Sequence, residues 1–309
     1  MCCIKNNLLI MLCIIISIIT SSHIALANSE LTGEEIIKLF MMEKGVAIEV
    51  NKKDENYQLF LKDILLGEYP ELTGKHSIFL TSQSELNLVL EHASKELSSV
   101  FHDFPEEPEA QEAIIGEKTV DSRKVLLTTY NRTDAIDYAY TWWDSRSPHY
   151  PDFGDSDCTN FISQAMLAGG FSKVGSGDGC RDENTHTEFY SYSASPPFWC
   201  LGSNRSWEWS TSWSVVWPFR DYFAHKNNYA TELGWTTSAS TAMHLLSPGD
   251  IVQLQNKQGD NWISYHNMLV TDTDSNDLLL TYHARNRKDK PLSSIPTGST
   301  QRYMLIKFP

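Results

Sequence analysis

Basic residues are scarce in this chain. Its 309 residues include 25 lysines and arginines against 39 aspartates and glutamates, for a formal net charge of −14. Nucleic-acid-binding surfaces need clusters of basic side chains to neutralise phosphates. The balance therefore argues against a nucleic-acid partner. It leaves the substrate open, because net charge mainly governs solubility and association.

Several catalytic motifs are missing as well. The sequence has no Gly-x-Ser-x-Gly elbow, no His-Glu-x-x-His pair and no Cys-x-x-Cys. These absences weaken the case for a serine hydrolase or a zinc enzyme. The glycine-rich stretch Gly175–Gly179 lacks the lysine of a phosphate-binding loop. We expect no cofactor and no metal.

Long apolar runs are absent after the first 27 residues. That first stretch has a short basic start at Lys5, an apolar core from Leu8 to Ile19 and small residues at Ala25-Leu26-Ala27. This is the form of a secretory signal peptide, and its apolar core is short for a membrane span of about 20 residues. We therefore expect cleavage near Ala27 and a secreted, periplasmic or extracellular protein that leaves the membrane. An uncleaved anchor is the alternative.

Cysteine is scarce in the expected mature protein. Three of the six cysteines lie in the signal segment, which leaves Cys158, Cys180 and Cys200. In an oxidising compartment Cys180 and Cys200 can pair across about 20 residues, a bridge that contributes about 3 kcal/mol. Cys158 is then an odd cysteine and a candidate reactive thiol. The two pairings that include Cys158 are the alternatives, and either would block a nucleophile there.

Cys158 stands at the predicted start of a helix. Apolar residues recur at helical spacing from Cys158 onward, Asp155 or Ser156 can cap the start, and Gly169-Gly170 provides a stop signal. The unpaired N–H groups of a helix start stabilise a thiolate and lower the pKa of a cysteine below its usual value of about 8.5. The pattern predicts a nucleophile; a small core cysteine is the alternative.

A hairpin downstream carries two histidines. Residues 262–271 and 278–283 are predicted as strands around the polar turn 272–277. In a simple hairpin of this length His266 faces His283 on the same side of the sheet, with Cβ atoms about 4.5–5.5 Å apart. We predict His266 as the base that serves Cys158 and His283 as the residue that orients its ring.

Other interpretations of the hairpin stay open. A one-residue slip in register would move His283 to the other face of the sheet. Asn267 and Asn286 are then the next candidates for the orienting partner. Two facing histidines can also bind a metal, but no third ligand stands at a suitable spacing, so we expect no metal site.

The sequence resembles the putative amidase domain family over about residues 128–300. This family is a branch of the papain-like cysteine peptidases related to bacterial cell-wall amidases. The resemblance implies a papain-like α+β fold and hydrolysis through an acyl-thioester. The matching residues are Tyr130, Asn131, Arg132, Ala135, Tyr138, Ala139, Trp142, Asp157–Gln164, Gly169, Gly170, Pro248–Ile251, His266 and Thr281–His283.

The resemblance assigns the catalytic cysteine and histidine to Cys158 and His266, and the third polar position to His283. Papain-type enzymes carry an oxyanion-hole glutamine six residues before the cysteine, where this chain has Asp152. An ionised carboxylate cannot donate a hydrogen bond, so we expect the backbone N–H of Cys158 to serve instead, together with a group not identified.

Residues flanking the nucleophile and a tryptophan-rich segment supply the candidate substrate contacts. Asp157 and Asn160 stand beside Cys158, and residues 171–217 contain five tryptophans, Trp207 and Trp209 among them. Tryptophans can line a cleft and stack on sugars or aromatic groups. A secondary core that shields the site is the alternative interpretation.

The chain is predicted to divide into a signal peptide at 1–27, an N-terminal region at 28–105, a linker at 106–127 and a catalytic domain at 128–309. The linker is placed by its acidic, proline-containing start. Helices are expected at Gly33–Met42, Ser84–Leu97 and 134–143, with a strand at Val46–Val50. The N-terminal region is a propeptide that covers the cleft, a targeting module or a helical brace.

Three functions compete. The first is an exported cysteine hydrolase that cleaves an amide or peptide bond through an acyl-thioester, with peptidoglycan stem peptides as substrate. The second passes the same thioester to an amine, as a transpeptidase or a transglutaminase-like enzyme does. The third is a non-catalytic module that binds cell wall or glycan. An intact Cys158 and His266 favour the first two.

Overall fold

The structure is a computed structural model that describes residues 31–74, 77, 79–97, 107–115, 130–175, 186–193 and 207–309. The predicted signal peptide and the predicted Cys180–Cys200 disulfide lie outside these residues. Cys158, which is buried, is a free thiol. None of the helices in the described ranges is both long and apolar enough to cross a lipid bilayer.

Four helices form the N-terminal region. Thr32 and Glu35 form a capping box that starts α2, and the side chain of Asp54 caps α3. The helices predicted at Gly33–Met42 and Ser84–Leu97 are confirmed. The strand predicted at Val46–Val50 is wrong, because that stretch is irregular. The four helices are α2 Gly33–Lys44, α3 Glu55–Leu65, α4 Pro70–Thr73 and α5 Gln83–Leu97.

A six-stranded antiparallel sheet forms the centre of the rest of the chain, in the order β3-β8-β4-β5-β6-β7. Its long strands β4 and β5 are buried over continuous runs of residues, because both faces of the sheet are covered. A separate ribbon pairs β1 Ser191–Ser193 with β2 Trp207–Trp209. The sheet strands are β3 Thr231–Thr236, β4 Ile251–Gln258, β5 Asn261–Thr273, β6 Leu278–Tyr282, β7 Arg287–Pro291 and β8 Gln301–Lys307.

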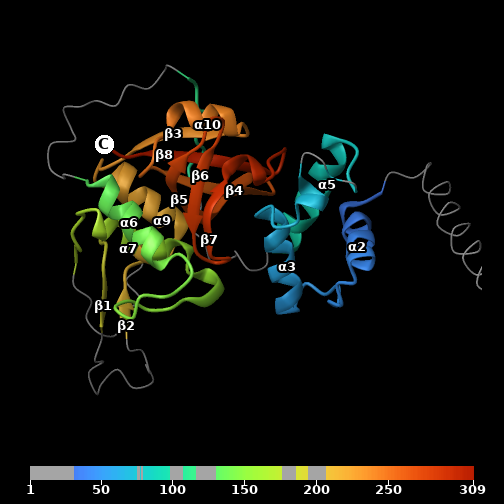
Figure 1. The fold of residues 1–309 in the computed structure, drawn as a ribbon, viewed down its shortest axis with the longest axis horizontal. Helices are drawn as coiled ribbons and strands as arrows, with labels where there is room; N and C mark the ends of the chain where they lie inside the picture. Colours follow the sequence, from blue (N-terminus) through green and yellow to red (C-terminus); the bar gives the residue numbers. More distant parts are fainter. Residues whose placement is uncertain are drawn as a thin grey trace, which may run out of the picture.

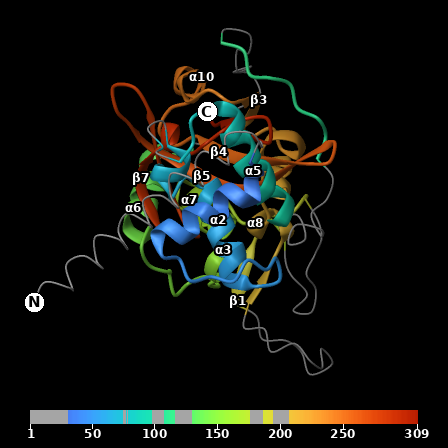
Figure 2. The same cartoon turned by 90° about the vertical axis from the view of Figure 1, so that its right-hand side faces the viewer.

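Helices cover both faces of the sheet, and each face has its own core. In Figure 1 the helices α6, α7 and α9 lie on one side of the sheet and the N-terminal helices on the other, while Figure 2 looks onto α2, α3 and α5. One core joins the N-terminal helices and α10 to side chains such as Leu254, Met268 and Tyr282, and the other joins α6, α7 and α9 to Ile251, Leu269 and Ile306. The helices of this part are α6 Arg132–Trp142, α7 Cys158–Ala168, α8 Thr211–Ser214, α9 Val216–Arg220 and α10 Ala239–Leu245. The chain is therefore α+β, with a helical N-terminal region followed by a sheet-rich domain.

Candidate active site

Cys158 is the first residue of α7, as predicted, but the helix start is built differently from our expectation. A 3-10 turn, Gly154–Ser156, leads into the helix, and Asp157 is the N-cap residue. Asp155 and Ser156 therefore lie inside that turn and do not cap α7. The helix ends at Gly169-Gly170 as predicted, and Cys158 is 5% exposed.

The flank of Cys158 contacts strand β5 beside His266. The amide of Asn267 donates to the hydroxyl of Thr159 over 3.1 Å, which joins the residue after the cysteine to the residue after the histidine. The sulfur of Cys158 lies 3.8 Å from the same hydroxyl. Burial is the main cause of the raised pKa of Tyr265, which lies on the other side of His266 in the strand. The charge of Cys158 raises this pKa further. The structure therefore brings the predicted nucleophile and base segments together.

His266 is buried and has no hydrogen-bond partner in the described part of the chain. It is 0% exposed, and neither ring nitrogen is satisfied. Its ring stands edge-on to Tyr282 at 4.8 Å between centroids. Burial lowers the pKa of His266 well below its usual value, and the charges of Lys62 and Lys290 lower it further. A neutral imidazole with a free nitrogen can accept a proton.

The predicted pairing of His266 with His283 is wrong. In the hairpin Leu269 pairs with Thr281 and Val270 with Leu280, and then the register shifts before Asp272. The strand β6 ends at Tyr282, so His283 already lies beyond the ladder. Our simple hairpin allowed for no bulge, and a bulge changes the register by one residue.

His283 instead forms a hydrogen bond with Asp157, the N-cap residue of α7. Its Nδ1 donates to Asp157 Oδ2 over 2.5 Å, and its Nε2 donates to the carbonyl oxygen of Trp142 over 2.8 Å. Its ring stacks on Phe161 at 3.8 Å. Both nitrogens are therefore engaged by oxygens of the protein. His283 thus has no nitrogen left for orienting His266.

The alternative orienting residues are engaged elsewhere too. Asn267 bonds to Thr159 and to the side chain of Gln253. Asn286, which has a positive φ of 46°, accepts a bond of 3.1 Å from Arg146. Neither asparagine contacts His266 through a described hydrogen bond.

Asp157 and Asn160 were predicted to bind substrate, but the fold uses both internally. They are 0% exposed and bond to each other over 2.8 Å. Asp157 also accepts from the backbone N–H of Phe153 and lies 3.2 Å from Nε of Arg146. The oxygen of Asn160 accepts from the indole of Trp213 over 2.7 Å. These side chains hold the approach to α7 in place.

The tryptophans divide between core and periphery. Trp213 is fully buried and Trp217 is 5% exposed, which agrees with the core interpretation. Trp207 and Trp209 lie in β2 and are half-buried, and Trp209 packs against Phe153 at 4.7 Å between ring centroids. This contact places Trp209 beside the loop that precedes Cys158. Trp199 lies outside the described residues.

A pocket of about 470 Å³ adjoins this loop. Asp152, at the position of the papain glutamine, lines it with a side chain that is 60% exposed. The carboxylate of Asp152 accepts from the backbone N–H of Gly154 and lies 3.4 Å from Nε of Arg146. Its contacts are those of an acceptor, so Asp152 cannot replace the glutamine as an oxyanion donor.

The N-terminal region contacts the same end of the sheet. Lys62 of α3 donates to the carbonyl of Asp155 over 2.6 Å, three residues before Cys158. Glu68 accepts from Lys290 over 2.8 Å and from Arg287 over 2.9 Å. The segment after α3 therefore bonds to β7, and α3 to the turn before the nucleophile. Sequence reasoning missed α3, although its apolar residues recur at helical spacing.

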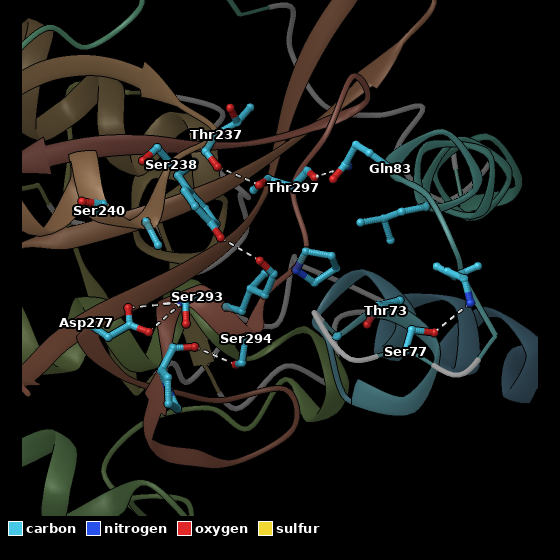
Figure 3. Close-up of a pocket in the computed structure, with 18 of the residues that line it drawn as sticks. Thr73, Ser77, Gln83, Thr237, Ser238, Ser240, Asp277, Ser293, Ser294 and Thr297 are labelled. Atoms are coloured by element: carbon cyan, nitrogen blue, oxygen red, sulfur yellow. Dashed lines mark hydrogen bonds between the residues drawn. The ribbon is translucent and has the colours of Figure 1, made fainter.

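A large cavity lies away from Cys158. It has a volume of about 850 Å³ and separates α4 and α5 from α10 and the chain near Pro296. Figure 3 shows that hydroxyl groups dominate its lining, and neither Cys158 nor His266 lines it. The labelled hydroxyl residues are Thr73, Ser77, Thr237, Ser238, Ser240, Ser293, Ser294 and Thr297. Nowhere in the described ranges do three histidine, cysteine, aspartate or glutamate side chains gather as metal ligands would.

Comparison with known proteins places these residues in a family. Residues 129–306 match the family described as "Putative amidase domain", and this range contains Cys158, His266 and His283. The chain belongs to the putative amidase domain family. The members of this family are assigned to amide hydrolysis by that description. A hydrolase that acts on an amide bond is the activity that membership supports.

The chain is also similar to Uncharacterized protein YhbB of Bacillus subtilis (strain 168). The two are 28% identical over 164 residues, which cover 51% of this chain and 43% of YhbB. The chain therefore spans less than half the length of that relative. No solved structure matches the chain.

Proposed function

We propose that this protein is a papain-like cysteine hydrolase in which Cys158 attacks an amide carbonyl and His266 is the base. The observation that carries the proposal is the pairing of two unusual residues in neighbouring segments. Cys158 is a free thiol at a helix start, and His266, in the strand that the next residue of the helix contacts through Asn267, is buried with both described ring nitrogens unpaired. Leaving a buried polar group unpaired costs about 1–3 kcal/mol, and a catalytic role is one explanation for such a group.

The chemistry follows from these positions. The neutral ring of His266 takes the proton of the Cys158 thiol, and the thiolate adds to the carbonyl. The first N–H groups of α7 point toward the developing oxyanion, which the positive end of the helix stabilises. The protonated ring then gives its proton to the leaving amine. Water finally releases the acyl group from the thioester.

Access to the nucleophile controls turnover in this proposal. Cys158 is 5% exposed and His266 is 0% exposed, so the described structure is a closed form. The contact of Lys62 with Asp155 lies on the turn that leads into Cys158. Binding of a substrate therefore has to move the segments around this turn.

Peptide amides of the bacterial cell wall are the substrate class that we propose. The resemblance to cell-wall amidases and the predicted signal peptide support a peptidoglycan stem peptide that is met outside the cytoplasm. We further propose that the mature protein acts there free of the membrane. The acidic charge gives no reason to invoke nucleic acid.

The test is digestion of purified peptidoglycan and of its stem peptides by the full chain, followed by mass spectrometry. The wild type is expected to release a new amine and a new carboxylate, and the Cys158→Ala variant to release neither. His266→Gln is expected to lose activity while Cys158 stays available to alkylation. Retained cleavage by Cys158→Ala would refute the nucleophile. A product carrying an added primary amine would instead identify a transferase.

A further inference from the structure

The part of the chain that matches the amidase family contains a buried pocket that binds a carboxylate. The carboxylate comes from Glu107, which lies outside that part. The side chain of Glu107 is 2% exposed, and its Oε2 accepts from Nη2 of Arg220 over 2.7 Å. Gln255 and the hydroxyl of Ser264 donate to the same oxygen over 2.9 and 2.8 Å. The backbone N–H of Ser264 donates to the other oxygen. Four converging donors make a site that fits a carboxylate.

The segment that carries Glu107 is also held by its main chain. The N–H of Ala113 donates to the carbonyl of Trp235 over 2.6 Å, and the N–H of Trp235 donates to the carbonyl of Gln111 over 2.9 Å. The indole of Trp235 donates to the carbonyl of Ala110 over 3.0 Å. These bonds do not involve the Glu107 side chain. A change at Glu107 therefore removes the carboxylate without removing the anchors of the segment.

A series of buried hydrogen bonds connects this pocket to the proposed nucleophile. Arg220 Nη1 donates to the oxygen of Gln253 over 3.0 Å, and the amide nitrogen of Gln253 donates to the oxygen of Asn267 over 2.8 Å. The amide nitrogen of Asn267 then donates to the hydroxyl of Thr159 over 3.1 Å. That hydroxyl lies 3.8 Å from the sulfur of Cys158. The linking side chains are all 0% exposed.

The hydrogen-bond series has a direction, because each side-chain amide in it has one donor end and one acceptor end. Arg220 can only donate, so it takes the oxygen of Gln253 and turns the amide nitrogen toward Asn267. The same logic turns the nitrogen of Asn267 toward Thr159. The Thr159 oxygen thereby acts as an acceptor, and its own O–H is left to donate to Cys158. Such a donor stabilises the thiolate over the thiol.

We propose that Glu107 is a positioning residue: its carboxylate fixes Arg220, and through Gln253 and Asn267 it aims the Thr159 hydroxyl at the Cys158 sulfur. The inference rests on the proposed function in that Cys158 is the nucleophile. Nε of Arg220 already lies 3.1 Å from Glu232, so without the Glu107 carboxylate the guanidinium keeps that ion pair but loses the acceptor on Nη2, and Nη1 is no longer held toward Gln253. In this proposal the amidase domain depends on the carboxylate of Glu107, which the segment before the domain supplies.

The experiment uses Glu107→Ala in the full chain, with Glu109→Ala as the matched control on an exposed position of the same segment. Two quantities are measured: kcat and KM for the substrate that the wild type cleaves, and the pH dependence of Cys158 alkylation by iodoacetamide. In Glu107→Ala we expect kcat to fall by up to about 100-fold, as small misplacements of catalytic groups do. KM stays near the wild-type value, and the midpoint of alkylation moves to higher pH.

Chemical rescue of Glu107→Ala by a small carboxylate distinguishes a role of Glu107 in positioning Arg220 from a role in holding the fold together. Formate or acetate can enter the space left in Glu107→Ala and is expected to restore kcat and the alkylation midpoint toward wild type, whereas chloride at equal ionic strength is not. The conservative Thr159→Val variant removes the hydroxyl group at the Cys158 end of the hydrogen-bond series. It is expected to show the same alkylation shift with no response to formate.

Two results would overturn the inference: wild-type kcat and alkylation in Glu107→Ala, or a loss in that variant that neither formate nor acetate reverses. If Glu107→Ala fails to fold, an unshifted alkylation midpoint in Thr159→Val overturns it instead. Alkylation needs no substrate, so it also separates the two proposals. If the wild type cleaves no amide while Glu107→Ala shows an alkylation shift that formate reverses, the proposed hydrolase is refuted and the positioning role of Glu107 stands.

Discussion

The buried neutral state of His266 makes a quantitative prediction about stability and pH. Because burial holds the pKa of His266 well below 6.5, the folded protein keeps this ring neutral while the unfolded chain takes up a proton near that pH. The unfolded state thus binds more protons at lower pH. Stability conferred by the neutral ring is present above pH 6.5 and is lost as the pH falls below it.

The size of the loss follows from the linkage. With an unfolded value near 6.5 and a folded ring that stays neutral, lowering the pH from 7 to 5 costs at most about 2 kcal/mol. The lowered pKa of His92 adds a loss of the same sign, and the raised pKa of His225, held chiefly by Glu232, opposes it. A comparison between variants removes these contributions.

The assay is urea unfolding of the wild type and of His266→Gln at pH 7 and pH 5. The wild type should lose up to about 2 kcal/mol more than the variant over this interval, because only the wild type has the buried imidazole. His149→Gln, at an exposed position, controls for the removal of a histidine in general. Equal pH dependence in the wild type and His266→Gln would refute the assignment of a neutral, buried base.

Other substitutions test how the surrounding segments are held. Asp157→Ala should destabilise the fold by more than about 1 kcal/mol in urea unfolding, because it leaves the buried side chains of His283 and Asn160 without their hydrogen-bond partner; a smaller loss would contradict this. Glu68→Ala should speed the alkylation of Cys158, since it frees two cations of β7 from the segment after α3; an unchanged rate would mean that this segment does not limit access. Gly234→Ala should cost more than about 1 kcal/mol, because its φ is +104° and a Cβ would come 2.2 Å from the carbonyl oxygen of Gln111; an unchanged midpoint in thermal unfolding would contradict it.

Periodicity was enough to place the elements that carry the site. The apolar spacing after Cys158 and the stop signal Gly169-Gly170 predicted the start and end of α7, and the strand-forming run around His266, bounded by a polar turn, predicted β5. The same signal was present for α3, where Tyr57, Phe60, Leu61 and Ile64 recur at helical spacing and are buried. That helix could therefore have been predicted from the sequence.

Register and long-range contacts could not be predicted in the same way. The shift between Val270 and Asp272 leaves no mark in the pattern of apolar residues, yet it moves His283 off the face of His266. The bond between Glu107 and Ser264 joins residues 157 positions apart, and local propensity says nothing about such a pair. Which carboxylate meets which donor depends on how the whole chain folds.

The two histidines of the hairpin show how partners distinguish a structural ring from a reactive one. The nitrogens of His283 both lie at hydrogen-bond distance from oxygens of the protein, so this ring is fixed in the fold and holds the N-cap Asp157. The nitrogens of His266 have no described partner, and burial keeps the ring neutral. A base must be able to gain and lose a proton during the reaction, and the ring of His266 is the one with nitrogens free for this, which is why we propose it as the base. For Cys158 the contacts decide less, because the 3.8 Å approach of the Thr159 hydroxyl fits both our proposed nucleophile and a core cysteine, so the alkylation of its thiol is the measurement that separates them.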